Sequence, residues 1–110
     1  MLQRQRFENS ASEIRALLEE TQSLALTSQV SHRLGFDAND HSLLIKRKHS
    51  GSYPILQKRP AEEEMTLVAT RWPSFGPFGF ALSGTILLDS PEFQTSIVVS
   101  SFGRIRQTDL

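Results

Sequence analysis

Residues 7–25, FENSASEIRALLEETQSLA, carry the most informative pattern in this chain. The apolar and small residues of this stretch recur at alternating steps of four and three along one side, widened by two leucines: Phe7, Ala11, Ile14, Leu18, Thr21 and Ala25, with Leu17 and Leu24. An α-helix has about 3.6 residues per turn, so this spacing gathers them on one face. The stretch therefore predicts an amphipathic helix over about residues 3–27 that buries this face against the rest of the chain.

The residues before Phe7 supply no helix cap. Residues 1–6 contain no Ser, Thr, Asp or Asn, and Arg4 and Arg6 place positive charge where the helix dipole disfavours it. We interpret this pattern as part of a longer natural helix and expect an upstream apolar segment of roughly twenty residues, enough to span a membrane. The alternative is a helix that begins at Ser10, where residues 10–13 match a capping box.

After the helix the apolar pattern changes to period two, which is typical of β-strands. Strands are expected at residues 28–36, 42–48, 53–58, 65–72, 80–88, 95–101 and 104–108. Residues 37–40, DAND, predict a turn, whereas residues 73–79 contain two prolines and two glycines and predict a loop. The expected fold class is α+β, in which an N-terminal amphipathic helix packs on an antiparallel β-sheet, with a β-meander over about residues 28–108.

The alternation also predicts which side chains form the core of a single domain spanning residues 1–110. The helix is expected to contribute four residues: Ile14, Leu17, Leu18 and Leu24. The strands are expected to contribute the apolar residues of their inward face: Leu34, Leu43, Ile45, Leu67, Ile86, Leu88, Ile97 and Val99.

The composition excludes several classes of protein. Twelve lysines and arginines balance twelve aspartates and glutamates, so no global field favours nucleic acid or an anionic membrane. The chain contains no cysteine, which removes disulfides, cysteine-rich zinc sites and thiol catalysis.

No set of polar residues has the spacing of a catalytic or metal-binding motif. The histidines lie at irregular intervals, at His32, His41 and His49. Residues 37–40 resemble the start of a calcium loop but lack the turn glycine and the distal glutamate of an EF-hand. The acidic run at residues 62–64 and the basic run at residues 46–49 are interpreted as solvated surface. We therefore predict no catalytic residue, no cofactor, no metal site and no nucleic-acid partner, and a protein that is not an enzyme.

The loop at residues 73–79 is the best candidate for a partner contact. It carries Phe75 and Phe78, and Trp72 lies directly before it. Two prolines limit the entropy that is lost when such a loop is ordered, and aromatic residues dominate many interfaces. The alternative is that the two phenylalanine rings fold back and close the open end of the core.

Three segments resemble the GspH/FimT family of minor pseudopilins and minor pilins. The helical residues 12–18 and the continuation TSQV at residues 27–30 are similar to the helix and the first strand of that family. Residues 97–106, IVVSSFGRIR, resemble its closing hairpin, and Phe78-Gly79 is similar to its middle region. The family's prepilin signature, a glycine before a hydrophobic segment with a glutamate near its start, is not among these residues.

The resemblance implies a mechanical role for the chain. It implies a type IV pilin-like subunit of a bacterial type II secretion or pilus filament, which acts in assembly and protein transport with other pseudopilin or pilin subunits. An upstream helix would hold the subunit in the inner membrane, with this domain on the periplasmic side. The alternative is a freestanding soluble protein-binding module of α+β fold, which would use a sheet edge or the aromatic loop.

Overall fold

A single long helix begins close to the start of the chain. The computed structural model describes residues 3–109, and α1 spans Arg4–Ser28. Gln3, the residue before the helix, makes no capping bond with its side chain, and the first turn contains no acidic residue. Ser10 lies inside the helix, so the alternative in which the helix begins there is wrong. The phase of the apolar face, which already holds at Phe7, outweighs the local capping box.

The buried face of α1 is the face that the sequence predicts. Its buried residues are Phe7, Ala11, Ile14, Leu17, Leu18, Thr21 and Ala25. Leu24 is only partly buried, at the margin of the core. The helix ends where Gln29 adopts a left-handed conformation with φ 58°. The side-chain amide of Gln29 donates hydrogen bonds to the carbonyl oxygens of Leu26 and Pro77, at 3.0 and 3.1 Å. These bonds join the end of the helix to a distant loop.

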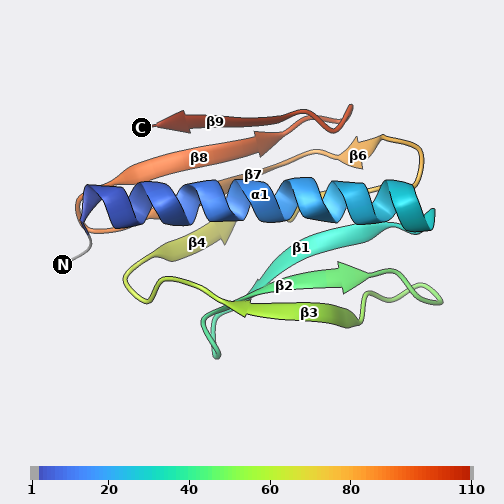
Figure 1. The fold of residues 1–110 in the computed structure, drawn as a ribbon, viewed down its shortest axis with the longest axis horizontal. Coiled ribbons are helices and arrows are strands. Elements are labelled where there is room, and N and C mark those ends of the chain that lie inside the picture. Colours follow the sequence, from blue (N-terminus) through green and yellow to red (C-terminus); the bar gives the residue numbers. More distant parts are fainter. Residues whose placement is uncertain (1–2, 110) are drawn as a thin grey trace.

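The strands form two antiparallel sheets, and α1 runs lengthwise across both of them (Figure 1). The first sheet has the order β3-β2-β1-β5-β6: Ile55–Pro60, Ser42–Arg47, His32–Asp37, Ser74–Phe75 and Ala81–Leu82. The second sheet has the order β4-β7-β8-β9: Thr66–Ala69, Gly84–Asp89, Gln94–Val99 and Ile105–Asp109. The α+β class expected from the sequence, with an N-terminal helix packed on antiparallel β-structure, is confirmed.

The expectation of a simple meander is wrong. The chain leaves β4 in the second sheet and crosses to β5, which pairs with β1 in the first sheet. This pairing gives the second edge of β1 a partner for its main-chain groups, which otherwise would have none on that side. The segment expected as one strand at residues 80–88 is therefore divided into β6 and β7, which belong to different sheets.

Several strand boundaries differ from those expected from the sequence. The first strand begins at His32 rather than at residue 28, because α1 continues through Ser28. β3 runs on to Pro60 and takes up residues expected to lie in a charged connector. The expected loop at residues 73–79 contains the two residues of β5.

The core lies between α1 and the inner faces of both sheets. Every side chain predicted for it is buried, apart from the marginal Leu24. Phe75 and Met65 join the core as well, at 1% exposure each. The strand periodicity therefore identifies the inward face correctly even where it does not identify the sheet.

The turn between β1 and β2 is closed by its own side chains. Asp37 Oδ1 accepts hydrogen bonds from the main-chain N–H groups of Asn39 and Asp40, at 2.9 and 3.4 Å. The Asp40 carboxylate accepts a hydrogen bond from the Lys58 ammonium on β3, and this bond raises the pKa of Lys58 above its usual value. The carboxylates of this turn therefore stabilise the β1–β2 hairpin through hydrogen bonds, as expected for an Asx turn.

Within residues 3–109, no helix is both long enough and apolar enough to cross a membrane.

Candidate partner interface

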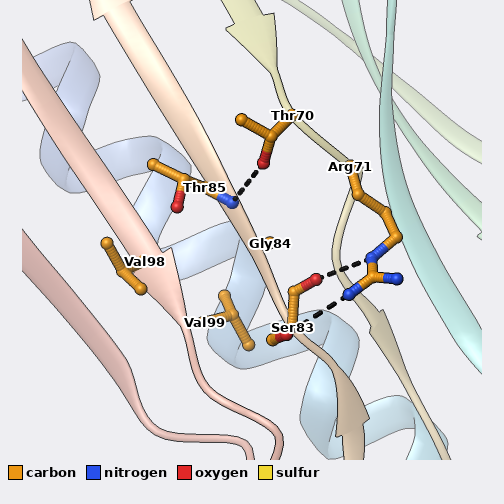
Figure 2. A pocket seen from close by; sticks show the side chains of 7 residues that line it. All are labelled: Thr70, Arg71, Ser83, Gly84, Thr85, Val98 and Val99. Atoms are coloured by element: carbon orange, nitrogen blue, oxygen red, sulfur yellow. Dashed lines mark hydrogen bonds between the residues drawn. The ribbon is translucent and has the colours of Figure 1, made fainter.

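A pocket of about 470 Å³ lies where β7 and β8 meet the connection between β4 and β5 (Figure 2). It is lined by Thr70, Arg71, Ser83, Gly84, Thr85, Val98 and Val99. Figure 2 shows Arg71 turned toward Ser83, where its Nε donates to the main-chain oxygen at 2.8 Å and its Nη2 to the hydroxyl at 3.3 Å. Arg71 is the only ionisable group in this lining, so the pocket holds no acid–base pair.

Gly84 in this pocket is a steric requirement of the fold. A β-carbon at Gly84 would lie 2.1 Å from the carbonyl oxygen of Arg71. We expect Gly84→Ala to lower the free energy of unfolding by about 2–3 kcal/mol, because main-chain atoms must move apart. Thermal melting should show a fall of about 8–16 °C for a domain of this size.

Gly35→Ala is the matched control for this substitution. A β-carbon at Gly35 meets only the end of the Lys46 side chain, at 3.4 Å, and that side chain can move aside. Its melting temperature should stay within about 4 °C of the unsubstituted protein. Equal losses from the two substitutions would show that the contact with Arg71 is not what requires glycine at position 84.

The histidines do not share a site. His32 is buried with its Nδ1 2.7 Å from the oxygen of Val30, and His41 places Nε2 2.6 Å from the oxygen of Glu62. His49 closes a small bridge with Ser52. No group of three His, Asp or Glu side chains within the described part of the chain could hold a metal ion.

We expect chelation to leave the stability of the domain unchanged. The carboxylates of the β1–β2 turn are engaged with main-chain N–H groups and Lys58, and therefore do not form a complete ligand set for calcium. Melting curves recorded with EDTA and with added calcium should superimpose. A melting temperature that rises with calcium and falls with chelator would contradict this prediction.

The structure separates the three aromatic residues proposed as a partner contact. Phe75 is 1% exposed and belongs to the core, and Trp72 is partly buried and packs against it. Phe78 is 76% exposed. A ring inside the core cannot also cover a partner, so Phe78 is the one residue of the three whose side chain is largely available for contact. Trp72 instead lines a depression with Arg71 and Leu82.

Two aromatic rings that the sequence did not single out extend the exposed surface near Phe78. Phe80 is 63% exposed and Phe102 is 78% exposed, with their ring centroids 6.1 Å apart. We call Phe78, Phe80 and Phe102 the aromatic end patch. They lie on the β5–β6 loop and the β8–β9 turn, at the end of the molecule where α1 ends (Figure 1). Exposed large apolar groups that cluster in this way mark interaction surfaces.

The fold holds this patch in place through main-chain contacts. The N–H of Ala81 donates to the oxygen of Ser101 at 2.9 Å, which links the residues next to Phe80 and Phe102. Gly103 ends the turn with φ +81°, and its oxygen accepts a hydrogen bond from the Gln22 amide at 3.0 Å. The turn that carries Phe102 is therefore fixed to α1, and the segment that carries Phe80 is hydrogen-bonded to that turn.

The charge near the aromatic end patch has one sign. Lys48 and Phe80 line the same depression, and Arg104 is exposed two residues after Phe102. Residues 21–36, 65–88 and 93–108, which include the helix end and both patch segments, contain no Asp or Glu. The surface thus combines exposed aromatic rings with flanking cations, and it can bind an apolar group that has an acidic rim.

A sequence signal for this patch exists but is weak on its own. Each of the patch segments places a phenylalanine beside a glycine with positive φ, Gly79 or Gly103. A bulky ring beside a tight turn is often exposed. Nothing in the sequence, however, brings the two turns together.

The helix laid across antiparallel sheets is the fold of type IV pilin-like head domains. The minor pilin FimU of Pseudomonas aeruginosa superimposes with a TM-score of 0.78 at 18% identity, over 96% of this chain and 90% of that one. The minor pseudopilin EpsH of the Vibrio cholerae type 2 secretion system superimposes with a TM-score of 0.76 at 14% identity, over 93% and 95%.

The likeness to these proteins lies in the fold rather than in the sequence. No protein-family model matches the chain, and no curated protein matches it by sequence.

Proposed function

We propose that this chain is a minor pseudopilin or minor pilin subunit of a bacterial type II secretion or type IV pilus-like filament. Its role is assembly and protein transport rather than catalysis, and its partners are other subunits of pilin type. The observation that carries the proposal is the pilin-like fold over nearly the whole chain, which FimU and EpsH share. The aromatic end patch adds a surface suited to contact with a neighbouring subunit.

The proposal places the domain on the periplasmic side of the bacterial inner membrane. An apolar helix upstream of α1 would anchor it there, and would leave the lipid for the filament when the subunit assembles. The open reading frame of the natural gene tests this placement, since it must encode roughly twenty apolar residues that continue into α1.

Disruption of the gene tests the proposed role. We expect loss of secreted proteins from the medium or loss of surface pili, and full recovery when the natural gene is supplied. The Phe78→Ser variant should restore the function poorly, because it removes an exposed aromatic contact while the domain stays folded. Val68→Ser, which changes an exposed apolar residue on the second sheet, is the matched control and should restore it fully.

A strain that secretes normally and retains its pili after disruption would contradict the proposed role. If Phe78→Ser and Val68→Ser restore secretion or piliation equally, the proposed role stands but the aromatic end patch is not needed for it. The contact would then have to lie elsewhere on the surface of the domain.

A further inference from the structure

The two ends of the molecule carry surfaces of different character. The aromatic end patch lies at the end of the molecule where α1 ends. A small hollow of about 150 Å³ is lined by residues of the first turns of α1, by residues 92–94 and by Asp109. Figure 1 shows that α1 begins at the opposite end of the molecule, near the end of β9. Phe7 and Phe93 form the apolar floor of this hollow, with ring centroids 5.6 Å apart. Phe93 is only partly buried and packs against the core.

Acidic side chains surround this apolar floor. Glu8, Glu92 and Asp109 line the hollow together with one cation, Arg4. Arg4 lies 5.2 Å from the centre of the Phe93 ring and 3.8 Å from the Glu8 carboxylate. Three carboxylates against one guanidinium leave the rim acidic. We call these residues the acidic hollow.

The aromatic end patch has the complementary composition. Its rings are exposed, Lys48 lines a depression together with Phe80, and Arg104 is exposed two residues after Phe102. The acidic hollow presents an apolar depression with a rim of the opposite charge. Shape and charge are therefore complementary between opposite ends of the same chain.

We propose that the aromatic end patch of one copy of this chain docks into the acidic hollow of a second copy. The inference rests on the proposed function for its setting, a filament in which subunits of pilin type contact one another. Such a contact is heterologous, because two different surfaces meet. Each docked pair keeps one free patch and one free hollow, so further copies can add in the same direction.

The physics of this contact predicts a weak and salt-dependent association. The hollow has a volume of about five water molecules, at ~30 Å³ for each in the liquid, which an entering aromatic ring would displace. The surrounding charges are exposed, so their attraction is screened by salt. We expect a dissociation constant of about 0.1–1 mM for the isolated chain at low salt.

Sedimentation velocity of the chain over a range of concentrations tests the proposal. Phe102→Glu places a carboxylate in the patch, and Glu92→Lys reverses one charge of the hollow. Each should weaken self-association by about tenfold or more. The matched controls are Val68→Glu and Glu63→Lys, exposed positions outside both surfaces, and both should change it by less than about twofold.

A mixture of the two variants separates head-to-tail docking from other modes. The Phe102→Glu variant keeps an intact hollow and the Glu92→Lys variant keeps an intact patch. Together they should form a one-to-one complex with near-original affinity that does not grow further. Circular dichroism spectra and melting curves should first show that both variants are folded.

Several outcomes would overturn the inference. The first is a chain that stays monomeric at about 1 mM and low salt. The second is that the Phe102→Glu and Glu92→Lys variants self-associate as strongly as the unsubstituted chain. The third is that the mixture of these two variants associates no more than either variant alone. Binding to a short DNA duplex or to a different subunit without self-association would also overturn it. The gene disruption tests the proposed function separately from self-association. If the disrupted strain secretes and forms pili normally while the purified chain still self-associates, the proposed function is wrong and the docking inference stands.

Discussion

Leu18→Asp is expected to abolish folding of this domain. Leu18 is completely buried between α1 and both sheets, in the middle of the helix face that organises the core. The substitution removes a large apolar side chain and places a carboxylate where no partner can reach it. The two effects together should cost more than about 5 kcal/mol, which is comparable to the whole stability of a domain of this size.

The measurement is the presence or absence of a cooperative thermal transition and of a dispersed amide spectrum. Arg15→Ala and Glu19→Ala are the controls, because both residues lie on the exposed face of the same helix. Their free energies of unfolding should change by less than about 0.5 kcal/mol. A folded Leu18→Asp variant, or equal sensitivity in all three, would mean that the wrong helix face has been assigned to the core.

The second large effect is expected at Phe75, in the segment first proposed as a partner contact. Phe75 is 1% exposed and sits on β5, which joins the first sheet beside β1. Phe75→Ser leaves a cavity and a hydroxyl inside the core, at a cost of about 3–5 kcal/mol. We expect a fall in melting temperature of at least about 12 °C.

Phe78→Ser is the matched comparison, because it makes the same chemical change three residues further along. Phe78 is largely exposed, so its free energy of unfolding should change by less than about 0.5 kcal/mol. Chemical denaturation of the two variants distinguishes core from surface at this loop. A stable Phe75→Ser variant would show that Phe75 is not part of the core and is again a candidate for partner contact. An unstable Phe78→Ser variant would show that Phe78 belongs to the core.

The helix could be predicted from the sequence because its determinants are local. The recurrence of apolar residues at Phe7, Ile14 and Leu18 needs no information about the rest of the chain. The same is true of the turn at residues 37–40, which Asp37 closes with bonds to its own neighbours. The inward faces of the strands followed from alternation alone.

The order of the strands could not be predicted in this way. The pairing of β5 with β1 joins segments about forty residues apart, and two residues are too short for a periodic pattern. The loop prediction at residues 73–79 was reasonable for its prolines and glycines. This prediction does not include β5, because residues 74 and 75 become a strand by pairing with the free edge of β1 and not through their local sequence.

The helix, its buried face, the class of fold and the resemblance to pilin-like proteins can all be predicted from local residue patterns. Which aromatic residues are available to a partner depends instead on how distant segments pack. Phe75 and Phe78 both lie in the segment of residues 73–79, and each precedes a glycine. The Phe75 ring is buried because β5 pairs with β1, whereas the Phe78 ring is exposed. Phe80 and Phe102 meet because two turns pack at the end of α1, and such long-range packing leaves no periodic trace in the chain.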